Sequence, residues 1–240
     1  MKLGLNDEYD IQCGYEAGCL GYSLYNQLTA AGVKCVILAP TTMLTPQGVR
    51  IKTDMRDAYM IAQCLSYGGY HAVYIPTEAD DSVKEYLRMR NDHKLALKKI
   101  KQQINAFCIR HGFCYDGTKW TLAHLNWLKK LEITNELYRE TLDEYMASYE
   151  EQEAKIERYD KRIEEIAEQT KYYDKVKKLK CFLGIKTHTA LSLIVENGDF
   201  ERFAKGNQYA SYLGLAPGEN SSSDSIHRLG ITKAGNSHLG

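Results

Sequence analysis

The stretch KCVILAP, residues 34–40, decides the predicted fold of the first part of this chain. It is a continuous apolar, β-branched run that ends at a proline, which is typical of a buried strand in a parallel sheet. DIQCGYEA at 10–17 alternates apolar and polar residues and predicts a shorter strand. GYSLYNQLTAAG at 21–32 predicts a helix between the two strands that ends at Gly32.

RIKTDMRDAYMIAQCL at 50–65 predicts a second helix, so the expected order is strand, helix, strand, helix. That order indicates a small α/β unit with a right-handed crossover. Asp54 and Asp57 lie one turn apart at the start of this helix, and Glu16 lies at the carboxyl end of the first strand, where open parallel sheets form their sites. Two interpretations stay open. The aspartates are a helix cap and a favourable first-turn acid, or they join Glu16 in binding a divalent cation such as Mg²⁺.

Two long helices are predicted in the middle of the chain. The first runs from about Asp80 to His111, and the second carries an apolar seam with alternating spacings of three and four, in which Gln152 fills one position. The seam predicts either a coiled coil between chains or packing onto the first helix as an antiparallel hairpin, and both can hold together. The stripe of the first helix is Val83, Leu87, Leu97, Ile100, Ile104 and Phe107, and the seam of the second is Leu142, Tyr145, Tyr149, Ile156, Tyr159, Ile163 and Ile166.

The composition is that of a soluble globular protein, with 44% hydrophobic and 26% charged residues among 240. The formal net charge of zero argues mildly against a dedicated nucleic-acid module, although segments 93–103 and 171–180 are basic and 150–169 is acidic. Such segregation fits either a basic face against phosphate or ordinary solvated helix surfaces. The seven cysteines, without a CxxC pair, and the absence of a bilayer-spanning run or signal peptide predict a cytoplasmic protein with no membrane partner.

The C-terminal part contains a glycine turn between two apolar helical stretches within 182–203, with Thr187 as the expected cap of the second helix. Such a helical hairpin can present backbone N–H groups to DNA phosphate. A short helix is predicted in NQYASYLGLAP (207–217), followed by a serine- and glycine-rich loop at 218–240.

The loop carries a serine cluster and nearby basic residues. Ser221 and Ser222 are candidate nucleophiles, but a serine hydroxyl is a weak nucleophile unless a base or metal activates it. His227, Arg228 and Lys233 can hold a phosphate by charge-assisted hydrogen bonds. The plain alternative is a flexible polar turn.

Three stretches together resemble a DEDD-type insertion-sequence transposase, the family that includes the Piv invertase and the bridge-RNA-guided recombinases. They are GYEAGCLGYSLYNQLTAAGVKCVILAP (14–40), RIKTDMRDAYMIA (50–62) and YLGLAPGENSSSDSIHRLGITKAGNSHL (212–239), and their order and separation also match. The resemblance implies α/β plus α architecture: a partial RuvC-like, ribonuclease-H-like domain at 1–78, a helical hairpin or coiled coil at 79–172, and a C-terminal helical transposase domain at 173–240. The last domain would contain the helix-hairpin-helix and the serine loop.

The resemblance also implies site residues. Glu16, Asp54 and Asp57 correspond to the second, third and fourth acids of an Mg²⁺ site, and Ser222 to the nucleophile, with Ser221 as the fallback. Ser223 stands where the family has a glycine, which is a departure from its pattern. The DNA- or phosphate-binding candidates are His227, Arg228, Lys233 and Asn236.

By the same resemblance we expect a DNA transposase or site-specific recombinase of bacterial, nucleoid-associated location. Its partners would be DNA, a structured guide RNA and further copies in a dimer or tetramer. The family's first acidic strand and its last arginine and helix have no counterpart here, so we expect a piece truncated at both ends. The alternatives are an inactive fragment that only binds nucleic acid, a RuvC-like junction nuclease that uses the acids alone, and a coiled-coil assembly protein.

Overall fold

The computed structural model describes residues 11–40, 43, 53–219, 228–232, 235–236 and 238–239. The chain divides into two compact units, Met1–Ile75 and Pro76–Gly240, each of which is described by itself. The three-part domain division at 78 and 172 stays a prediction.

The first unit has the predicted order of strand, helix, strand, helix: β1 (Gln12–Glu16), α1 (Ser23–Ala30), β2 (Lys34–Leu38) and α2 (Asp54–Tyr67). β1 and β2 pair in parallel, so that Gln12 lies opposite Lys34 and Glu16 opposite Leu38. The order and the parallel pairing confirm the predicted α/β unit. The core here is a small cluster of Leu38, Met43 and Cys64, with side chains of α2 packed around it.

Helix α2 has the ends that its sequence predicts. The Thr53 side chain accepts a hydrogen bond from the Arg56 backbone N–H, 3.4 Å away, and Asp54 and Asp57 occupy the first turn. The helix closes at Gly68 in the left-handed conformation, with φ of 67°, which glycine adopts without a steric penalty.

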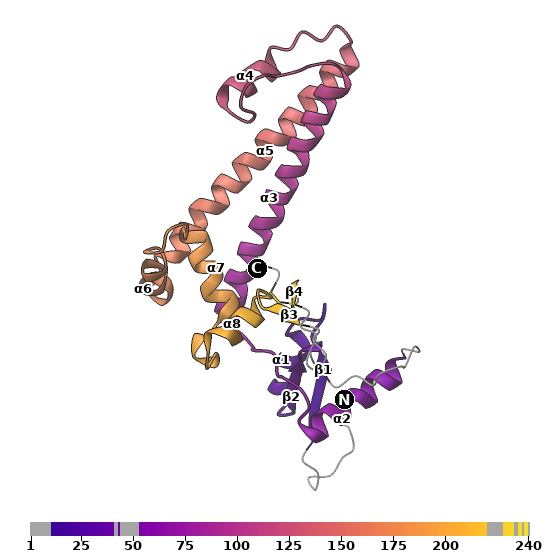
Figure 1. Cartoon of the computed structure of the whole chain (residues 1–240), viewed down its shortest axis with the longest axis vertical. Helices are drawn as coiled ribbons and strands as arrows, with labels where there is room; N and C mark the ends of the chain where they lie inside the picture. The colour runs from indigo at the N-terminus through magenta and orange to yellow at the C-terminus, as the bar shows by residue number, and fades with distance from the viewer. Residues whose placement is uncertain are drawn as a thin grey trace. The chain divides into compact units, whose positions relative to one another are not determined.

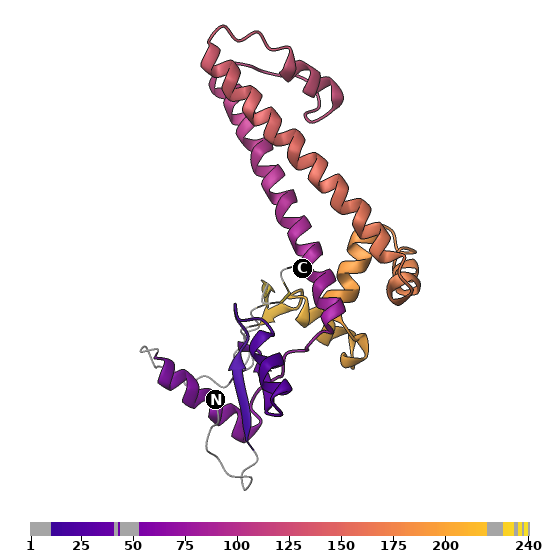
Figure 2. The same cartoon turned by 180° about the vertical axis from the view of Figure 1, so that it is seen from behind.

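The second unit is built on an antiparallel pair of long helices, α3 (Glu78–Arg110) and α5 (Glu136–Ala167). Figures 1 and 2 show them side by side, with α4 (Leu122–Lys129) at one end of the pair and the C-terminal helices at the other. Helix α4 was not predicted. The predicted stripes face each other and are buried at Leu87, Leu97, Ile104, Phe107, Leu142, Tyr149, Ile163 and Ile166.

Polar pairs cross-link α3 and α5 between the two apolar ends of the hairpin. The seam residue Gln152 lies with its Oε1 2.9 Å from Nδ1 of His93, and Arg90 donates from Nε and Nη2 to Asp160 at 2.7 and 2.9 Å. The polar position of the seam therefore fixes the register within one chain, as in a hairpin. A coiled coil between chains stays a prediction.

At the base of the hairpin lie α6 (Thr170–Leu179), α7 (Thr187–Asn197), a 3₁₀ turn η2 (Phe200–Arg202) and α8 (Gly206–Tyr212). The glycine turn between α6 and α7 and the short helix α8 are as predicted. The cap prediction for Thr187 was wrong: Thr187 is the first residue of α7 and is itself buried, while Lys186 occupies the cap position without a side-chain hydrogen bond. Burial of the hydroxyl side chain explains the difference, because it faces the core rather than the helix end.

The segment predicted as a long serine- and glycine-rich loop contains two short strands. β3 (Pro217–Glu219) and β4 (Arg228–Ile231) pair antiparallel, with a register irregularity between Pro217 and Glu219. The loop prediction was wrong at these residues because strands of three and four residues leave too short a pattern to recognise. Within the part of the chain that is described, no helix combines the length and apolar character needed to cross a membrane.

Candidate functional site

The predicted serine nucleophile belongs to a segment that two paired strands enclose. β3 ends at Glu219 and β4 begins at Arg228, and these two residues are partners in the antiparallel register. Ser221, Ser222 and His227 lie between them and, with Lys233, fall outside the described residues. The pairing of Glu219 with Arg228 brings together the two described residues that flank the serine segment.

After β4, the chain returns to α8 and is locked there by a glycine. A Cβ built on Gly235 would lie 2.1 Å from the backbone nitrogen of Gly214 and 2.4 Å from the carbonyl oxygen of Tyr212. No side chain fits at that distance, and the obstacle is backbone, which cannot rotate away. The next residue, Asn236, donates its backbone N–H to the same Tyr212 carbonyl at 3.0 Å.

Asn236 also joins a buried ion pair. Its Nδ2 donates to Oε2 of Glu196 at 3.0 Å, while Arg88 of α3 donates from Nε and Nη2 to both oxygens of that carboxylate at 2.8 and 2.9 Å. The Tyr212 hydroxyl donates to the Glu196 backbone carbonyl at 3.0 Å. The carboxylate side chain is only 6% exposed, so these partners replace the water it lost.

The electrostatics of Glu196 follow from this arrangement. Burial opposes ionisation of the carboxyl, but the hydrogen bonds from Arg88 and Asn236 outweigh that effect and lower its pKa. The group is therefore a charged anchor at neutral pH, and it ties three separate segments, α3, α7 and the C-terminal loop, to one point.

Asn236 was predicted to bind DNA or phosphate, and its side chain is engaged within the chain. Besides the bonds from Nδ2, its Oδ1 accepts from the His238 backbone N–H at 2.9 Å. Its observed role is to position the loop, and phosphate binding by Asn236 stays a prediction. Glu196, Arg88 and Tyr212 were not predicted at all. The one available signal was a lone acid following the apolar run ALSLIV of 190–195.

The predicted acidic residues all belong to the α/β unit. Glu16 is the last residue of β1 and is half-buried, Asp54 is exposed in the first turn of α2, and Asp57 is half-buried one turn on. The Asp57 backbone N–H donates to the Thr53 carbonyl at 3.0 Å. Local structure thus agrees with both interpretations of the aspartates, since a first-turn acid and a metal ligand can occupy the same positions.

The described contact between α2 and β1 is made toward the C-terminal end of the helix. A Cβ at Gly14 of β1 would lie 3.1 Å from Leu65, so the C-terminal part of α2 contacts the strand. Asp54 lies 11 residues earlier, which is about 16 Å along a helix that rises about 1.5 Å per residue. Among the described residues, which include all three acids, no three Asp, Glu, His or Cys side chains are grouped to hold a metal ion. Their oxygens suit Mg²⁺ chemically, and a shared Mg²⁺ site for Glu16, Asp54 and Asp57 stays a prediction.

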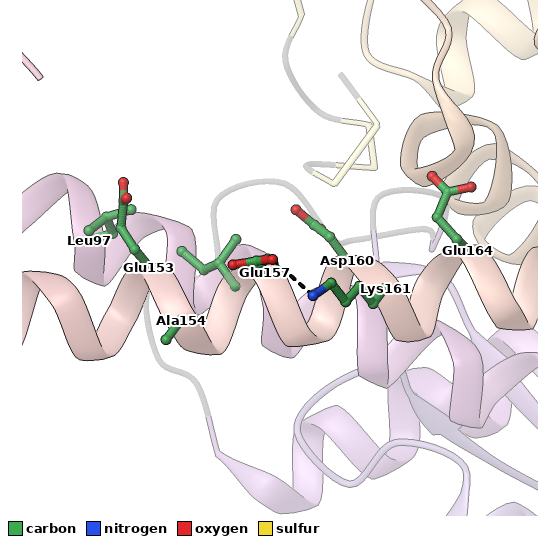
Figure 3. A pocket seen from close by; sticks show the side chains of 8 residues that line it. Leu97, Glu153, Ala154, Glu157, Asp160, Lys161 and Glu164 are labelled. Carbon is green, nitrogen blue, oxygen red and sulfur yellow. Dashed lines mark ion pairs between the residues drawn. The ribbon is translucent and has the colours of Figure 1, made fainter. Parts of the chain in front are cut away.

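A groove runs along α5 in the helical unit, with a volume of about 610 Å³ (Figure 3). Four acidic side chains of α5 line it beside an apolar floor that includes Leu97 and Ile156, and Lys161 forms an ion pair with Glu157 at 2.9 Å. The acids are Glu153, Glu157, Asp160 and Glu164. Ion pairs also join Glu153 to Lys101 at 3.3 Å and Asp160 to Arg90 at 2.7 Å, so much of the negative charge of the groove is offset within the chain.

Known proteins resemble this chain over most of its length. Residues 176–239 match the sequence model described as "Transposase IS116/IS110/IS902 family". The "Transposase for insertion sequence element IS1533" of Leptospira borgpetersenii is 37% identical over 210 residues, 86% of this chain and 60% of that protein. The y4qE protein of Sinorhizobium fredii (strain NBRC 101917 / NGR234) is 33% identical over 226 residues, 94% of this chain and 55% of that protein.

A third likeness is more distant. The "Transposase for insertion sequence element IS1111A" of Coxiella burnetii (strain RSA 493 / Nine Mile phase I) is 26% identical over 215 residues, 82% of this chain. The chain spans between 55% and 60% of the length of these relatives. The matched segment 176–239 contains Glu196, Tyr212 and Asn236 and encloses the serine loop. The family match and the three likenesses relate this chain to the insertion-sequence transposases of the IS116/IS110/IS902 family.

Proposed function

We propose that this chain carries the serine end of a DNA transposase, in which Ser222 attacks a phosphodiester. The observation that carries the proposal is the anchoring of the serine loop. β3 and β4 close its two ends, and Gly235 and Asn236 fasten it to α8 and Glu196, all within the stretch that matches the transposase family. A nucleophile on a loop gains from rigid supports, because attack needs a fixed geometry.

In the proposed step, the Ser222 hydroxyl oxygen forms a bond to phosphorus and the bond from phosphorus to the 3′ oxygen breaks. The hydroxyl proton leaves the serine, and the departing 3′ oxygen gains a proton. The product is a serine–DNA phosphoester with a free 3′ hydroxyl. Attack by the 3′ hydroxyl of another strand reverses the exchange and reseals DNA, so the covalent link conserves the energy of the bond. His227, Arg228 and Lys233 are the proposed cations around the phosphate.

Glu16, Asp54 and Asp57 stay in the proposal as carboxylates for Mg²⁺, on the chemistry of their oxygens alone. Parallel strands followed by a helix with a first-turn acid pair support the assignment of this unit as RuvC-like. A structured guide RNA, a dimer or tetramer and a place in the bacterial cytoplasm at the nucleoid belong to the same proposal, by resemblance to the family.

The test is covalent trapping of DNA. The chain is incubated with a labelled duplex containing the ends of its insertion sequence, in Mg²⁺ and in EDTA, and denaturing gels are searched for a protein–DNA adduct. We expect an adduct that Ser222→Ala abolishes, that Ser221→Ala retains, and that Asp54→Asn and EDTA reduce. An adduct that persists in Ser222→Ala refutes the nucleophile. Duplex binding with no adduct in any variant selects the nucleic-acid-binding alternative, and cleavage without an adduct selects the junction nuclease.

A further inference from the structure

The turn between α6 and α7 exposes two large apolar side chains side by side. Phe182 is 64% exposed and Leu183 is fully exposed, at 104% of its reference area. Their neighbours on either side, Leu179 and Ile185, pack against the core at the base of the hairpin. The turn is therefore amphipathic over a few residues, with one pair of apolar side chains anchoring it and the other pair facing solvent.

Hydrogen bonds give this turn a defined shape. Gly184 adopts φ of 88°, a conformation that glycine tolerates and larger residues resist. The backbone N–H of Phe182 donates to the Leu179 carbonyl at 3.1 Å, and that of Ile185 donates to the Phe182 carbonyl at 3.2 Å. The exposed pair is consequently presented on a fixed tip rather than on an open loop.

The surroundings of the tip are strongly cationic. Residues 170–186 contain six lysines and one aspartate. The lysines nearest the tip, Lys178, Lys180 and Lys186, are all exposed. Helix α7 begins behind the tip with no acidic residue in its first turn and no side-chain cap, so its partial positive charge is not offset by a capping side chain.

We propose that the α6–α7 turn docks on duplex DNA, with Leu183 and Phe182 entering the minor groove and the flanking lysines on the phosphates of both strands. This inference rests on the proposed action on DNA and adds a specific contact surface to it. Proteins that bind the minor groove frequently insert exposed apolar side chains between base steps, while cationic side chains nearby contact the phosphates. A protein partner suits the surface less well, because lysine is depleted at the cores of protein interfaces.

The charge pattern along the chain supports the choice of this turn. The turn follows the basic segment 171–180, which attracts phosphate, whereas the preceding segment 150–169 leans acidic. Residues 176–239, the stretch that matches the transposase family, include this turn as well as the serine loop.

The first experiment measures binding of the full chain to a labelled AT-rich duplex by fluorescence anisotropy. Leu183→Ser should weaken binding by about tenfold, because the wedge no longer buries its side chain in the groove. Leu122→Ser is the matched control, because Leu122 is likewise an exposed leucine, at 75% of its reference area, but lies on α4. Saturating the duplex with a minor-groove ligand such as netropsin should make wild type and Leu183→Ser bind alike.

The second experiment varies salt. The double variant Lys178→Gln with Lys180→Gln should reduce the slope of log K against log[salt] by about 1.8, which corresponds to two lost phosphate contacts. The control makes the same charge change on the acidic helix, with Lys155→Gln and Lys161→Gln, and should leave the slope unchanged. Thermal melts of each variant establish that it is folded.

Three results would overturn the inference: wild-type affinity in Leu183→Ser, an unchanged salt slope in the lysine variant, or self-association in sedimentation that Leu183→Ser abolishes without affecting DNA binding. The last would assign the tip to a second copy of the chain. If no serine–DNA adduct ever forms and yet Leu183→Ser weakens duplex binding, the proposed function fails and this contact surface stands.

Discussion

The helical unit and the α/β unit hold their candidate residues in different ways. In the helical unit, residues far apart in sequence are locked together, as Arg88 and Glu196 are across 108 positions. In the α/β unit, the described core is a small cluster at β2 and the C-terminal half of α2. The first turn of α2 lies outside that cluster. Met55, a residue of this first turn, has a side chain that is 83% exposed.

The two units therefore differ in how they support their candidate residues, which are the serine segment in one unit and the acidic residues in the other. The described residues that follow the serine segment are held by the buried Glu196 charge network and by Gly235, which admits no side chain. In the α/β unit, the described contact of α2 with β1 is made near Leu65, further along the helix than the aspartates. We infer that the described residues flanking the serine segment have more long-range contacts to hold them than the first turn of α2 has in the α/β core.

The strongest test of the comparison removes equivalent core side chains from the two units. Ile104 and Leu38 are both fully buried. Ile104→Ala should lower the free energy of unfolding of the helical unit by about 2–5 kcal/mol, through lost burial and the cavity left behind. Leu38→Ala should leave that unit unchanged and open the α/β unit instead, because the two units have separate cores.

Each unit offers its own probe for this measurement. Trp120 and Trp127 both lie in the helical unit, so tryptophan fluorescence in urea reports that unit, while thiol labelling of the buried Cys64 reports the α/β unit. Leu95→Ala, at a side chain that is 64% exposed, is the control and should change stability by less than about 0.5 kcal/mol. A shift of both probes by either core variant would mean that the units unfold together, and the contrast between them would be lost.

The sequence predicted elements wherever a periodic pattern ran long enough. The parallel strands, the long helices and their buried stripes followed from such patterns, whose chemistry is local. The short strands β3 and β4 gave too few residues for a pattern, and the burial of Thr187 depended on how α7 packs. The candidate residues of the site divide in the same way. The aspartates were recognisable from spacing at a helix start, whereas Glu196 matters through Arg88 and Asn236, partners that only the fold brings near.

A second prediction uses pH to isolate the Glu196 anchor. Its pKa is lowered in the folded chain, so it contributes stability above its unfolded pKa of about 4.5, and that stability is lost as pH falls through the lower folded value. Glu196→Gln should cost about 1–3 kcal/mol at pH 7, because Arg88 and Asn236 lose a charged partner. The difference in free energy of unfolding between wild type and Glu196→Gln should become smaller as the pH is lowered toward 3.

Tryptophan fluorescence in urea at several pH values measures that gap. Asp80 also has a lowered pKa, because hydrogen bonds from Lys171, Thr77 and Tyr172 outweigh its burial, so acid will still weaken the variant through that group. A gap that stays constant from pH 7 to 3 would show that Glu196 acts through its shape rather than its charge.

The smallest effects are expected at the helix starts, where the two units can be compared directly. Thr77 caps α3: its Oγ1 accepts from the Asp80 backbone N–H at 3.2 Å and from Lys171 at 3.1 Å, and it donates to the Asp80 carboxylate at 2.8 Å. Thr53 caps α2 through one long bond of 3.4 Å. Thr77→Ala should cost about 1–2 kcal/mol and Thr53→Ala about 0.5 kcal/mol, the upper and lower parts of the range for cap removal.

Tryptophan fluorescence reads the Thr77 variant, and Cys64 labelling reads the Thr53 variant. Serine at either position keeps the accepting oxygen and serves as the control, because only the methyl group is removed. A cost at Thr53 equal to that at Thr77 would mean that the first turn of α2 is held as firmly as that of α3. Asp54 and Asp57 would then be positioned as firmly as the acids in the first turn of α3, and the contrast between the two helix starts would be lost.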